Sequence, residues 1–576
     1  MTRAAISPYE VYRAAGETIP ERTLAWNVYG KDIDHVGRDG RPEWVDVPRP
    51  DPDQLLIRVD AVGLCFSDVK LIKLGGDHPK LYGRDLTTEP TRIGHETSVT
   101  VMAVGENLAG RFRAGQRLAI QPDIYVDGRS TAYGYTIPGG LIGYQVIGPE
   151  VLAADDGAYV IPVDDRLGYA ETALTEPWAC VEAAYTQRRR LWPQAGGRAW
   201  IVGRAEDRGP YRFGDLLRDT SNIVVSDVSP ELEETIRSAA PTATIERRAV
   251  DDVPGPIDDI ILLGVRSAVT VQRAADALAF RGVLAIVADD PLDGPVEIDV
   301  GRIHYHYTAY LGTTGRDVTA AYGETRNRAE LRPGGVTVIV GAAGPMGQMH
   351  IERALSMGDG PRLVIGVDLD PDRLRAAGAR LEAAAEAVGR RLVLSALGTE
   401  QGAVRTAVAG LTDGRGADDV IVTAPSPAAV RAASEALAPD GMLVLFAGLP
   451  VGTRVALDMD PVFLSGAQYT GTSGSRIADQ ALVVEKTLRG ELDPGRALGA
   501  VGGMDAAGDS LAALVEGRFA GKIVIFPHLR DLPLTSVADL AASDPNIAAR
   551  LGPGGAWTTD AEAVVFERYW DSPGTS

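Results

Sequence analysis

An internal repeat constrains the fold of this 576-residue chain more than any other feature. The segment AAYTQRRRLWPQAGGRAWIVG starts at Ala183, and it recurs as AAYGETRNRAELRPGGVTVIVG from Ala320. The match continues from IDDIILLG to ADDVIVTA, and from VEIDVGRIHYHYTAYLGTTG to VALDMDPVFLSGAQYTGTSG. Both copies follow the same strand, helix and strand order, and the first lacks roughly twenty residues in its middle. The sequence therefore predicts a tandem duplication of one α/β domain.

The second copy carries a nucleotide-binding fingerprint. VTVIVGAAGPMGQMHIERALSMG leads from a strand through glycines into a helix, and the next strand, LVIGVD, ends in Asp368. The residues of the turn are Gly341, Gly344, Pro345, Met346 and Gly347. Glycines at such a turn let backbone N–H groups and a helix N-terminus approach a pyrophosphate, and the acid then bonds the ribose hydroxyls. We predict a site for NAD, because Asp368 repels a 2′-phosphate, with NADP as the alternative.

The first copy has lost this fingerprint. Its turn reads VGRAEDRGPYRFGD, with Arg, Glu and Asp where the close backbone approach to a phosphate would occur. Carboxylates at that place repel a phosphate, although VVSDVSPE retains an acid at Asp227. We therefore expect this copy to be a degenerate relative of the second that does not bind a dinucleotide.

A candidate metal site lies before the repeat, between GLCFSD and IGHE. The stretch holds Cys65, Asp68, His95 and Glu96. A thiolate, an imidazole and carboxylates are the ligands that zinc takes in proteins. A lone cysteine is more often a small buried apolar residue, but the combination favours a metal. Short apolar runs around it, such as LLIRVDAVGL and SVTVMAVG, predict a β-rich, partly barrel-like domain up to about Asp165.

The sequence TALTEPWAC then changes to helical spacing. Because proline is tolerated in a first helical turn, we expect Glu176 at the helix entrance, before Pro177. Cys180 is interpreted as a core thiol. His304 and His306 would point the same way from a predicted strand, and such a pair is more often structural than metal-binding.

Composition excludes several classes of function. The formal net charge of −21 disfavours nucleic acids and anionic membranes, and 45% hydrophobic residues are typical of a globular protein. The sequence shows no apolar run long enough for a membrane span and no secretory signal at its start. We therefore expect a cytoplasmic protein whose two cysteines are free thiols.

These motifs resemble the zinc-containing, medium-chain alcohol and polyol dehydrogenases. GLCFSD, IGHE, TEPWAC, VGAAGPMG and GKIVIFP appear in that family's order, over residues 25 to 185 and 320 to 530. The form GPMGQMH and the Trp-containing tail look most like the sorbose-1-phosphate reductase-like branch. The resemblance implies an α/β protein with a GroES-like catalytic domain and two tandem Rossmann-like, doubly wound domains, the first of them degenerate. The expected division is 1–182, completed by about 480–530, then 183–319, 320–479 and a C-terminal extension, 531–576.

The resemblance also assigns roles. It makes Cys65, His95 and Glu176 ligands of a catalytic zinc, with Glu96 either a fourth ligand or a partner behind the ligands. Asp68 would accept the other ring N–H of His95 and hold its tautomer. The catalytic set is completed by Ser67, which would bond the substrate hydroxyl, and by Lys70, which stands where many relatives have a proton-relay histidine. The proton would then leave through this lysine, a water or a cofactor hydroxyl.

The implied reaction transfers a hydride between a nicotinamide cofactor and a secondary alcohol or ketone of a sugar, polyol or sugar phosphate. The loop after LAIQP has no cysteine, so we expect one zinc per chain and no structural zinc. The resemblance further implies a homo-oligomer, either a dimer or a tetramer. The alternative function is a catalytically silent or regulatory relative that binds zinc and nucleotide.

A group of basic residues between the first two metal ligands has two interpretations. The group consists of Lys70, Lys73, Lys80, Arg84 and Arg92. It is either solvated surface, which is the commoner fate of charged side chains, or a cleft that attracts a phosphate-bearing substrate.

Overall fold

The computed structural model describes residues 7–252, 255–398 and 402–570. The chain divides into two compact units. The first unit consists of Met1–Ala183, Arg375–Ala387 and Gly474–Ser576, and the second consists of Ala184–Leu374 and Val388–Ser473. The second unit holds most of both copies of the repeat, whereas Arg375–Ala387 of the second copy belongs to the first unit. The finer division into four parts stays a prediction.

The first unit is built on an eight-stranded sheet with the order β11-β7-β6-β4-β27-β26-β28, and β10 also pairs with β4. Its strands β26 and β27 come from the C-terminal part of the chain, and β27 runs antiparallel to β4. The strands of this unit are β1 (Arg22–Ala25), β2 (Asn27–Val28), β3 (Glu43–Asp46), β4 (Leu55–Gly63), β5 (Thr91–Arg92), β6 (Glu96–Val104), β7 (Arg117–Ile120), β8 (Tyr125–Val126), β9 (Arg129–Ser130), β10 (Tyr144–Ile147), β11 (Val160–Pro162), β26 (Leu498–Gly503), β27 (Lys522–Phe526) and β28 (Thr535–Ser536). The prediction of a β-rich domain is confirmed.

The helices of the first unit include a long one that begins earlier in the chain than the sequence predicts. They are α1 (Pro8–Arg13), α2 (Phe66–Leu74), α3 (Pro149–Leu152), α4 (Tyr169–Ala183), α13 (Ile477–Leu488), α14 (Ala507–Glu516), α15 (Val537–Ser543), α16 (Pro545–Ala548) and α17 (Thr559–Tyr569). The expected helix entrance at Glu176 is wrong, because α4 begins at Tyr169 and Pro177 lies inside it. Ala and Leu residues before the proline favour a helix, and burial of Leu174 and Trp178 offsets the backbone hydrogen bond that Pro177 cannot donate.

The C-terminal segment packs into the first unit. In α17, the fully buried Glu562 accepts hydrogen bonds from the Tyr9 hydroxyl at 3.0 Å and from the N–H groups of Tyr169 and Ala170 at 2.7 and 2.8 Å. These two N–H groups belong to the first turn of α4, which has no partners for them within the helix. The tail therefore caps the helix that carries Glu176.

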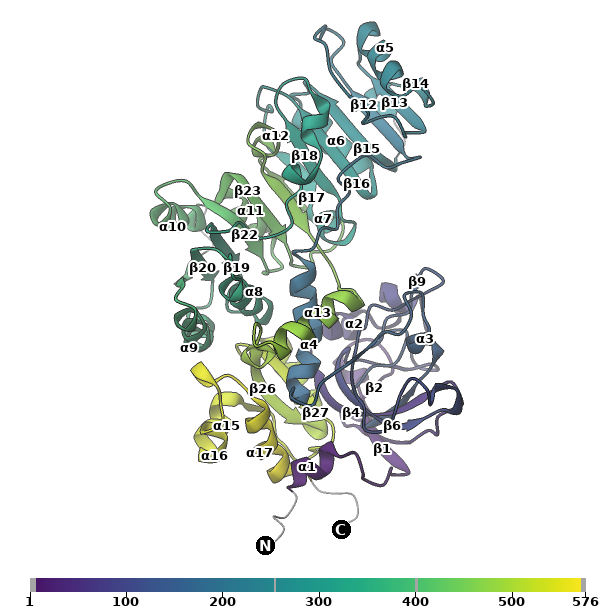
Figure 1. The fold of residues 1–576 in the computed structure, drawn as a ribbon, viewed down its shortest axis with the longest axis vertical. Coiled ribbons are helices and arrows are strands. Elements are labelled where there is room, and N and C mark those ends of the chain that lie inside the picture. The colour runs from purple at the N-terminus through teal and green to yellow at the C-terminus, as the bar shows by residue number, and fades with distance from the viewer. Residues whose placement is uncertain (1–6, 253–254, 399–401, 571–576) are drawn as a thin grey trace. The chain divides into compact units, whose positions relative to one another are not determined.

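The second unit is built on one twelve-stranded sheet that contains both copies of the repeat (Figure 1). The strand order is β14-β13-β12-β15-β16-β18-β25-β23-β22-β19-β20-β21. Each half has the order 3-2-1-4-5-6 of a doubly wound dinucleotide-binding sheet. In Figure 1 the strands labelled β12 to β18 belong to the first copy, and those labelled β19 to β23 belong to the second. The prediction of two tandem Rossmann-like domains is confirmed.

The two halves contain corresponding strands. In the first copy they are β12 (Arg198–Val202), β13 (Asn222–Ser226), β14 (Thr244–Arg247), β15 (Ile257–Leu263), β16 (Leu278–Val287), β17 (Val296–Asp299) and β18 (Ala309–Thr313). In the second they are β19 (Val336–Val340), β20 (Leu363–Asp368), β21 (Arg391–Ala396), β22 (Ala417–Val422), β23 (Leu437–Leu445), β24 (Arg454–Leu457) and β25 (Gln468–Gly471). Strands β17 and β24 form a separate two-stranded ladder.

The helices of the two copies correspond less well. The first has α5 (Pro230–Ala239), α6 (Ala268–Ala277) and α7 (Val300–Tyr305), and the second has α8 (Pro345–Ser356), α9 (Pro371–Ala387), α10 (Ala403–Leu411), α11 (Pro427–Glu435) and α12 (Asp460–Leu464). The predicted strand, helix and strand order is wrong at the start of the first copy, because residues 203–221 form turns where the second copy has α8. The expected strand around His304 is also wrong, since His304 lies in α7.

The duplication extends to individual hydrogen bonds. In the first copy, Arg190 Nη1 lies 3.1 Å from Asp259 Oδ1, and its Nη2 donates to the Asp258 carbonyl at 2.8 Å. In the second, Arg328 Nη1 lies 2.5 Å from Asp419 Oδ1, and its Nη2 donates to the preceding carbonyl at 3.1 Å. Both acids also accept a backbone N–H at 2.8 Å. The two copies are therefore braced in the same way at the start of their fourth sheet strand.

Candidate metal centre and nucleotide site

Two neighbouring strands bring the candidate metal ligands together. Gly63, at the end of β4, pairs with Glu96, at the start of β6. Cys65 follows β4 and His95 precedes β6. The thiol sulfur of Cys65, a ring nitrogen of His95 and a carboxylate oxygen of Glu96 all lie within 4.8 Å of one another. In the described part of the chain, this is the one such group of three or more potential metal ligands.

Asp68 ties the two sides of this cluster together. From the first turn of α2, its buried carboxylate accepts the Cys65 N–H at 2.9 Å and the Gly94 N–H at 3.1 Å, and it lies 3.2 Å from Nδ1 of His95. Burial alone would raise the pKa of Asp68, but His95 and these N–H donors hold it below its ordinary value. With Nδ1 bonded to the acid, Nε2 of His95 is left to face a metal.

Glu96 is held by a residue that the sequence prediction missed. Lys522, at the start of β27, donates to Glu96 Oε1, and both side chains are almost fully buried. Burial disfavours the ammonium, but Glu96 and then Cys65 raise the pKa of Lys522 above its ordinary value. The motif GKIVIFP contains this lysine, and the sequence signal is a charged residue at the start of an otherwise apolar strand.

Glu176 does not belong to the tight cluster of three. It lies in α4, one helical turn before Cys180, whose Sγ is 3.7 Å from Glu176 Oε1. Burial raises the pKa of Glu176 to about 7, with a further contribution from Glu96 that His95 partly opposes. The Glu176 carboxylate therefore lies within the electrostatic field of the cluster. Burial also raises the pKa of the Cys180 thiol, which fits a core thiol.

The cluster fits a bound cation. Glu96 Oε2 is buried and has no hydrogen-bond partner in the described protein, which is a costly arrangement for a carboxylate oxygen. A side chain at Gly63 would collide with that same oxygen, so glycine is needed for Glu96 to lie where it does. One thiolate, one imidazole and one carboxylate match the donor set that zinc prefers.

Polar side chains surround the cluster. Ser67 Oγ lies 3.7 Å from Cys65 Sγ. The ring of Tyr135 is centred 6.0 Å from that of His95, and Lys80 Nζ lies 4.8 Å from the centre of the tyrosine ring. Lys80 is ion-paired with Asp123 at 3.0 Å.

The structure gives contacts for several residues of the predicted basic group. Besides the ion pair of Lys80, Arg84 donates to the Thr136 carbonyl at 3.1 Å and lies 3.6 Å from Glu89. Lys70 and Lys73 belong to α2. Lys80 contacts the ring of Tyr135, which in turn lies next to the ring of His95.

The glycine turn of the second copy is shaped for a phosphate. Gly341 follows β19 with a φ of 96°, a conformation that favours glycine. A side chain at Gly347 would strike the Gly341 carbonyl and Ala342, whereas one at Gly344 would meet only the Gly341 carbonyl at 3.5 Å. The backbone at Gly344, which caps the N-terminus of α8, is thus open to a ligand. Asp368 reaches this turn, since its Oδ2 accepts the Ala343 N–H at 2.8 Å.

The equivalent turn of the first copy is closed by its own side chains. Asp207 accepts the Tyr211 hydroxyl at 3.0 Å and pairs with Arg316 at 3.0 Å, and Arg316 also lies over the Tyr211 ring. The Arg316 guanidinium occupies the space beside Gly209. Since the helix is missing as well, the N–H groups and dipole that bind a pyrophosphate are absent from residues 203–221.

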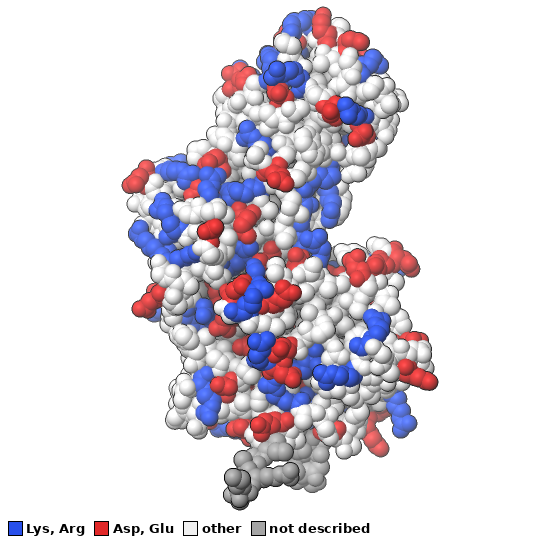
Figure 2. All heavy atoms as spheres, viewed as in Figure 1, with Lys and Arg blue, Asp and Glu red and all other residues white. Residues whose placement is uncertain are grey.

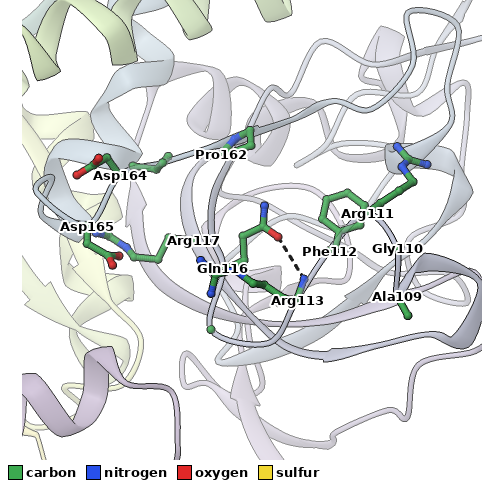
Figure 3. A pocket seen from close by; sticks show the side chains of 12 residues that line it. Ala109, Gly110, Arg111, Phe112, Arg113, Gln116, Arg117, Pro162, Asp164 and Asp165 are labelled. Carbon is green, nitrogen blue, oxygen red and sulfur yellow. Dashed lines mark hydrogen bonds between the residues drawn. The ribbon is translucent and has the colours of Figure 1, made fainter.

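An open groove of about 600 Å³ lies elsewhere in the first unit (Figure 3). It is lined by residues 109–113, 115–117 and 162–165. In Figure 3 the Gln116 side chain accepts a hydrogen bond from the Arg113 N–H, at 3.2 Å. No candidate ligand of the metal cluster lines this groove, so we do not assign it to the site.

One face of the molecule is drawn in Figure 2 with its charged side chains coloured. Acidic and basic side chains are interspersed over the face in Figure 2. In the described residues, every helix is too short or too polar to pass through a lipid bilayer.

Comparison with known proteins gives matches to both units. The model described as zinc-binding dehydrogenase matches residues 345–487, and that described as alcohol dehydrogenase GroES-like domain matches residues 51–181. The chain is 24% identical to L-sorbose 1-phosphate reductase of Klebsiella pneumoniae over 558 residues, which are 96% of this chain and 99% of the relative. It is 41% identical to sorbitol dehydrogenase of Bombyx mori over 268 residues, which are 44% of this chain and 72% of the relative.

A likeness among solved structures is to 2R,3R-butanediol dehydrogenase from Bacillus subtilis. Its TM-score is 0.51, with 16% sequence identity, and it covers 88% of this chain and 99% of the other. At this identity the likeness shows the fold alone.

Proposed function

This chain belongs to the zinc-binding dehydrogenase family, and on that premise we propose that it is a zinc- and NAD-dependent oxidoreductase acting on a sugar, a polyol or a sugar phosphate. The observation that carries the proposal is the cluster of Cys65, His95 and Glu96, in which Glu96 Oε2 is buried without a partner. The relative named L-sorbose 1-phosphate reductase supports a sugar phosphate as the substrate class.

We assign the metal to Cys65, His95 and one or both of the acids Glu96 and Glu176. A bound zinc supplies Lewis-acid stabilisation of negative charge on a substrate oxygen, and a bound dinucleotide supplies the hydride acceptor. Asp68 fixes the tautomer of His95 through its contact with Nδ1. Lys522 holds Glu96 in place and balances the negative charge of the cluster.

The proton of the substrate hydroxyl is assigned to Ser67 and Lys70. Ser67 Oγ lies beside the Cys65 sulfur, where it can accept a hydrogen bond from a hydroxyl bound next to the metal. Lys70, one turn further along α2, would pass the proton on toward solvent. Lys80 and Asp123 offer a donor and an acceptor to the further hydroxyls or the phosphate of a substrate.

The dinucleotide is assigned to the second copy. Its pyrophosphate would bind the open backbone at Gly344 and the N-terminus of α8, which are the two features that a phosphate needs. Asp368 favours NAD over NADP, because its carboxylate would repel a 2′-phosphate.

The experiment measures zinc content together with turnover. Purified protein is analysed for metal, and NAD reduction is followed with a panel of polyols and their phosphates, with NADP in parallel. We expect one zinc per chain and turnover of at least one class, and loss of both in Cys65→Ser. Zinc that is lost in Cys65→Ser without turnover of any substrate by the unaltered protein would favour the silent or regulatory alternative.

A further inference from the structure

The seam is the place where strands of the first copy pair with strands of the second. Equivalent residues of the two copies lie opposite one another there. Strands β18 and β25 are equivalent in the repeat, and they pair antiparallel through Tyr310 and Tyr469, which are themselves equivalent. Strands β17 and β24 are also equivalent, and they pair antiparallel with Glu297 opposite Ala456, again an equivalent pair. Pairing of like with like in antiparallel strands is what a two-fold axis produces.

Side-chain packing across the seam is reciprocal. A side chain at Gly312 in β18 would strike Phe463 of α12 in the other copy. At the equivalent Gly471 in β25, it would approach His304 of α7 in the first copy. Phe463 and His304 occupy equivalent places in the repeat. The first copy thus contacts the second through the same surface that the second uses to contact the first, as in a symmetric dimer.

The seam is apolar and continuous with the cores of both copies. A single hydrophobic cluster includes Ile298 and Ile303 of the first copy together with Val455, Leu457 and Phe463 of the second. Interfaces of this kind resemble a protein core cut in half and are typical of permanent association.

Hydrogen bonds also connect the two copies across the seam. The Gly452 N–H donates to Asp299 Oδ2 at 2.8 Å, and the Leu292 N–H donates to Asp460 Oδ1 at 2.9 Å. Each of them joins the backbone of one copy to a carboxylate of the other.

We propose that the first copy is a built-in partner subunit. Its strand β18 pairs with β25, the last strand of the second copy's half of the sheet. Without the first copy, this edge would need a second dinucleotide-binding chain to pair with it. An exposed edge strand is a site of association, so this cover has a physical purpose. Since the phosphate turn of the first copy is closed, the pair has one dinucleotide site instead of two. The count of sites rests on the proposed function, and the built-in partner does not.

The seam is tested with a disulfide between its two equivalent surface positions. Glu297 and Ala456 are directly opposite in antiparallel strands, at a separation that a disulfide can span. The double variant Glu297→Cys/Ala456→Cys is oxidised and analysed by non-reducing electrophoresis and peptide mapping. The controls are the two single variants and the unaltered chain, all of which keep the native cysteines.

We expect an intrachain disulfide that joins positions 297 and 456, with the mass of one 60.9 kDa chain. A covalent dimer of the double variant would show that the seam forms between chains and would overturn the proposal. So would a double variant that keeps both new thiols reduced, because the strands would then not be paired.

The number of sites is tested by titrating NADH, and separately NADPH, into the unaltered full chain in a calorimeter. We expect one bound dinucleotide per chain. Two per chain would overturn the assignment of the first copy as a partner without a site. Binding of neither cofactor would contradict the proposed function, whereas an intrachain disulfide in the same protein would leave the built-in partner standing.

Discussion

The two copies of the repeat share their architecture and differ in their chemistry. Both keep the six-strand order, and both keep an arginine paired with a buried aspartate at the fourth strand, Arg190 with Asp259 and Arg328 with Asp419. The second copy alone has a glycine turn that leads into a helix. Features that hold the sheet together are thus present in both copies, whereas those that bind a phosphate are present in one. The difference indicates that the first copy serves to support the second.

The largest expected effect comes from closing the phosphate turn. In Gly344→Val the added Cβ would meet only the Gly341 carbonyl, at 3.5 Å, and the side chain would lie where the pyrophosphate is assigned. We expect nucleotide affinity to fall by about 100-fold or more, because the ligand would lose its backbone N–H contacts. Calorimetric titration with NADH measures the loss.

Glu206→Val is the matched control, since Glu206 holds the equivalent position in the first copy. Its affinity for NADH should equal that of the unaltered chain. Equal losses in the two variants would contradict the assignment of the site to the second copy.

An effect of comparable size is expected from removing either bracing acid. Asp419→Ala and Asp259→Ala each leave a partly buried arginine without its partner, which costs about 3 kcal/mol of unfolding free energy. Denaturant unfolding with circular dichroism measures both. Similar losses support equal bracing of the two copies. A loss confined to Asp419→Ala would show that the first copy contributes little to the common sheet.

Next in size is the effect on cofactor choice. Asp368→Ser removes the carboxylate that would repel a 2′-phosphate, so the preference for NAD over NADP should fall by about tenfold. The dissociation constants of both cofactors measure it. Asp227→Ser, the equivalent change in the first copy, should leave the preference unaltered. A change in preference would show that the first copy takes part in cofactor binding and would contradict the assignment to the second copy.

The smallest expected effect is a pH dependence that both copies share. Burial raises the pKa of Asp259 and of Asp419 above the ordinary value of 3.8. The folded state therefore binds a proton more tightly than the unfolded state at each acid. The resulting stability is fully present below pH 3.8 and is lost as the pH rises through the raised pKa.

Unfolding free energies measured between about pH 3.5 and 7 test this. The variants Asp259→Asn and Asp419→Asn should each lose part of the decline in stability with rising pH, and to a similar extent. If stability of either variant declines as steeply as that of the unaltered chain, the acid in question does not titrate as described.

Much of the fold could be predicted from the sequence. The repeat and the alternation of strands and helices indicated two α/β copies, because periodic apolar patterns report directly on sheets and helices. The absence of a helix after β12 could not be predicted, since residues 203–221 still read as a glycine-containing turn like their counterpart. The start of α4 was placed too late because Pro177 is a strong boundary signal that burial of the surrounding side chains overrides.

The candidate site was predictable where its residues are close in sequence. Cys65 and Asp68 belong to one motif and His95 and Glu96 to another, so the two motifs needed only one strand pairing to meet. Lys522 comes from the other end of the chain, and nothing local indicates that its ammonium reaches Glu96. The reciprocal seam was equally hidden, because it depends on how equivalent strands pair and not on what either strand contains.

Transfer of deuterium is the most direct test of the proposed reaction. The zinc-loaded protein is incubated with NADH that carries deuterium on one face of the nicotinamide, or on the other, and with a panel of ketoses and ketose phosphates. Magnetic resonance of the products locates the label. The account predicts that one of the two labelled cofactors delivers deuterium directly to the new carbinol carbon of at least one substrate. Product in which the deuterium has been lost to solvent, or no transfer by a protein that binds both zinc and NADH, would contradict it.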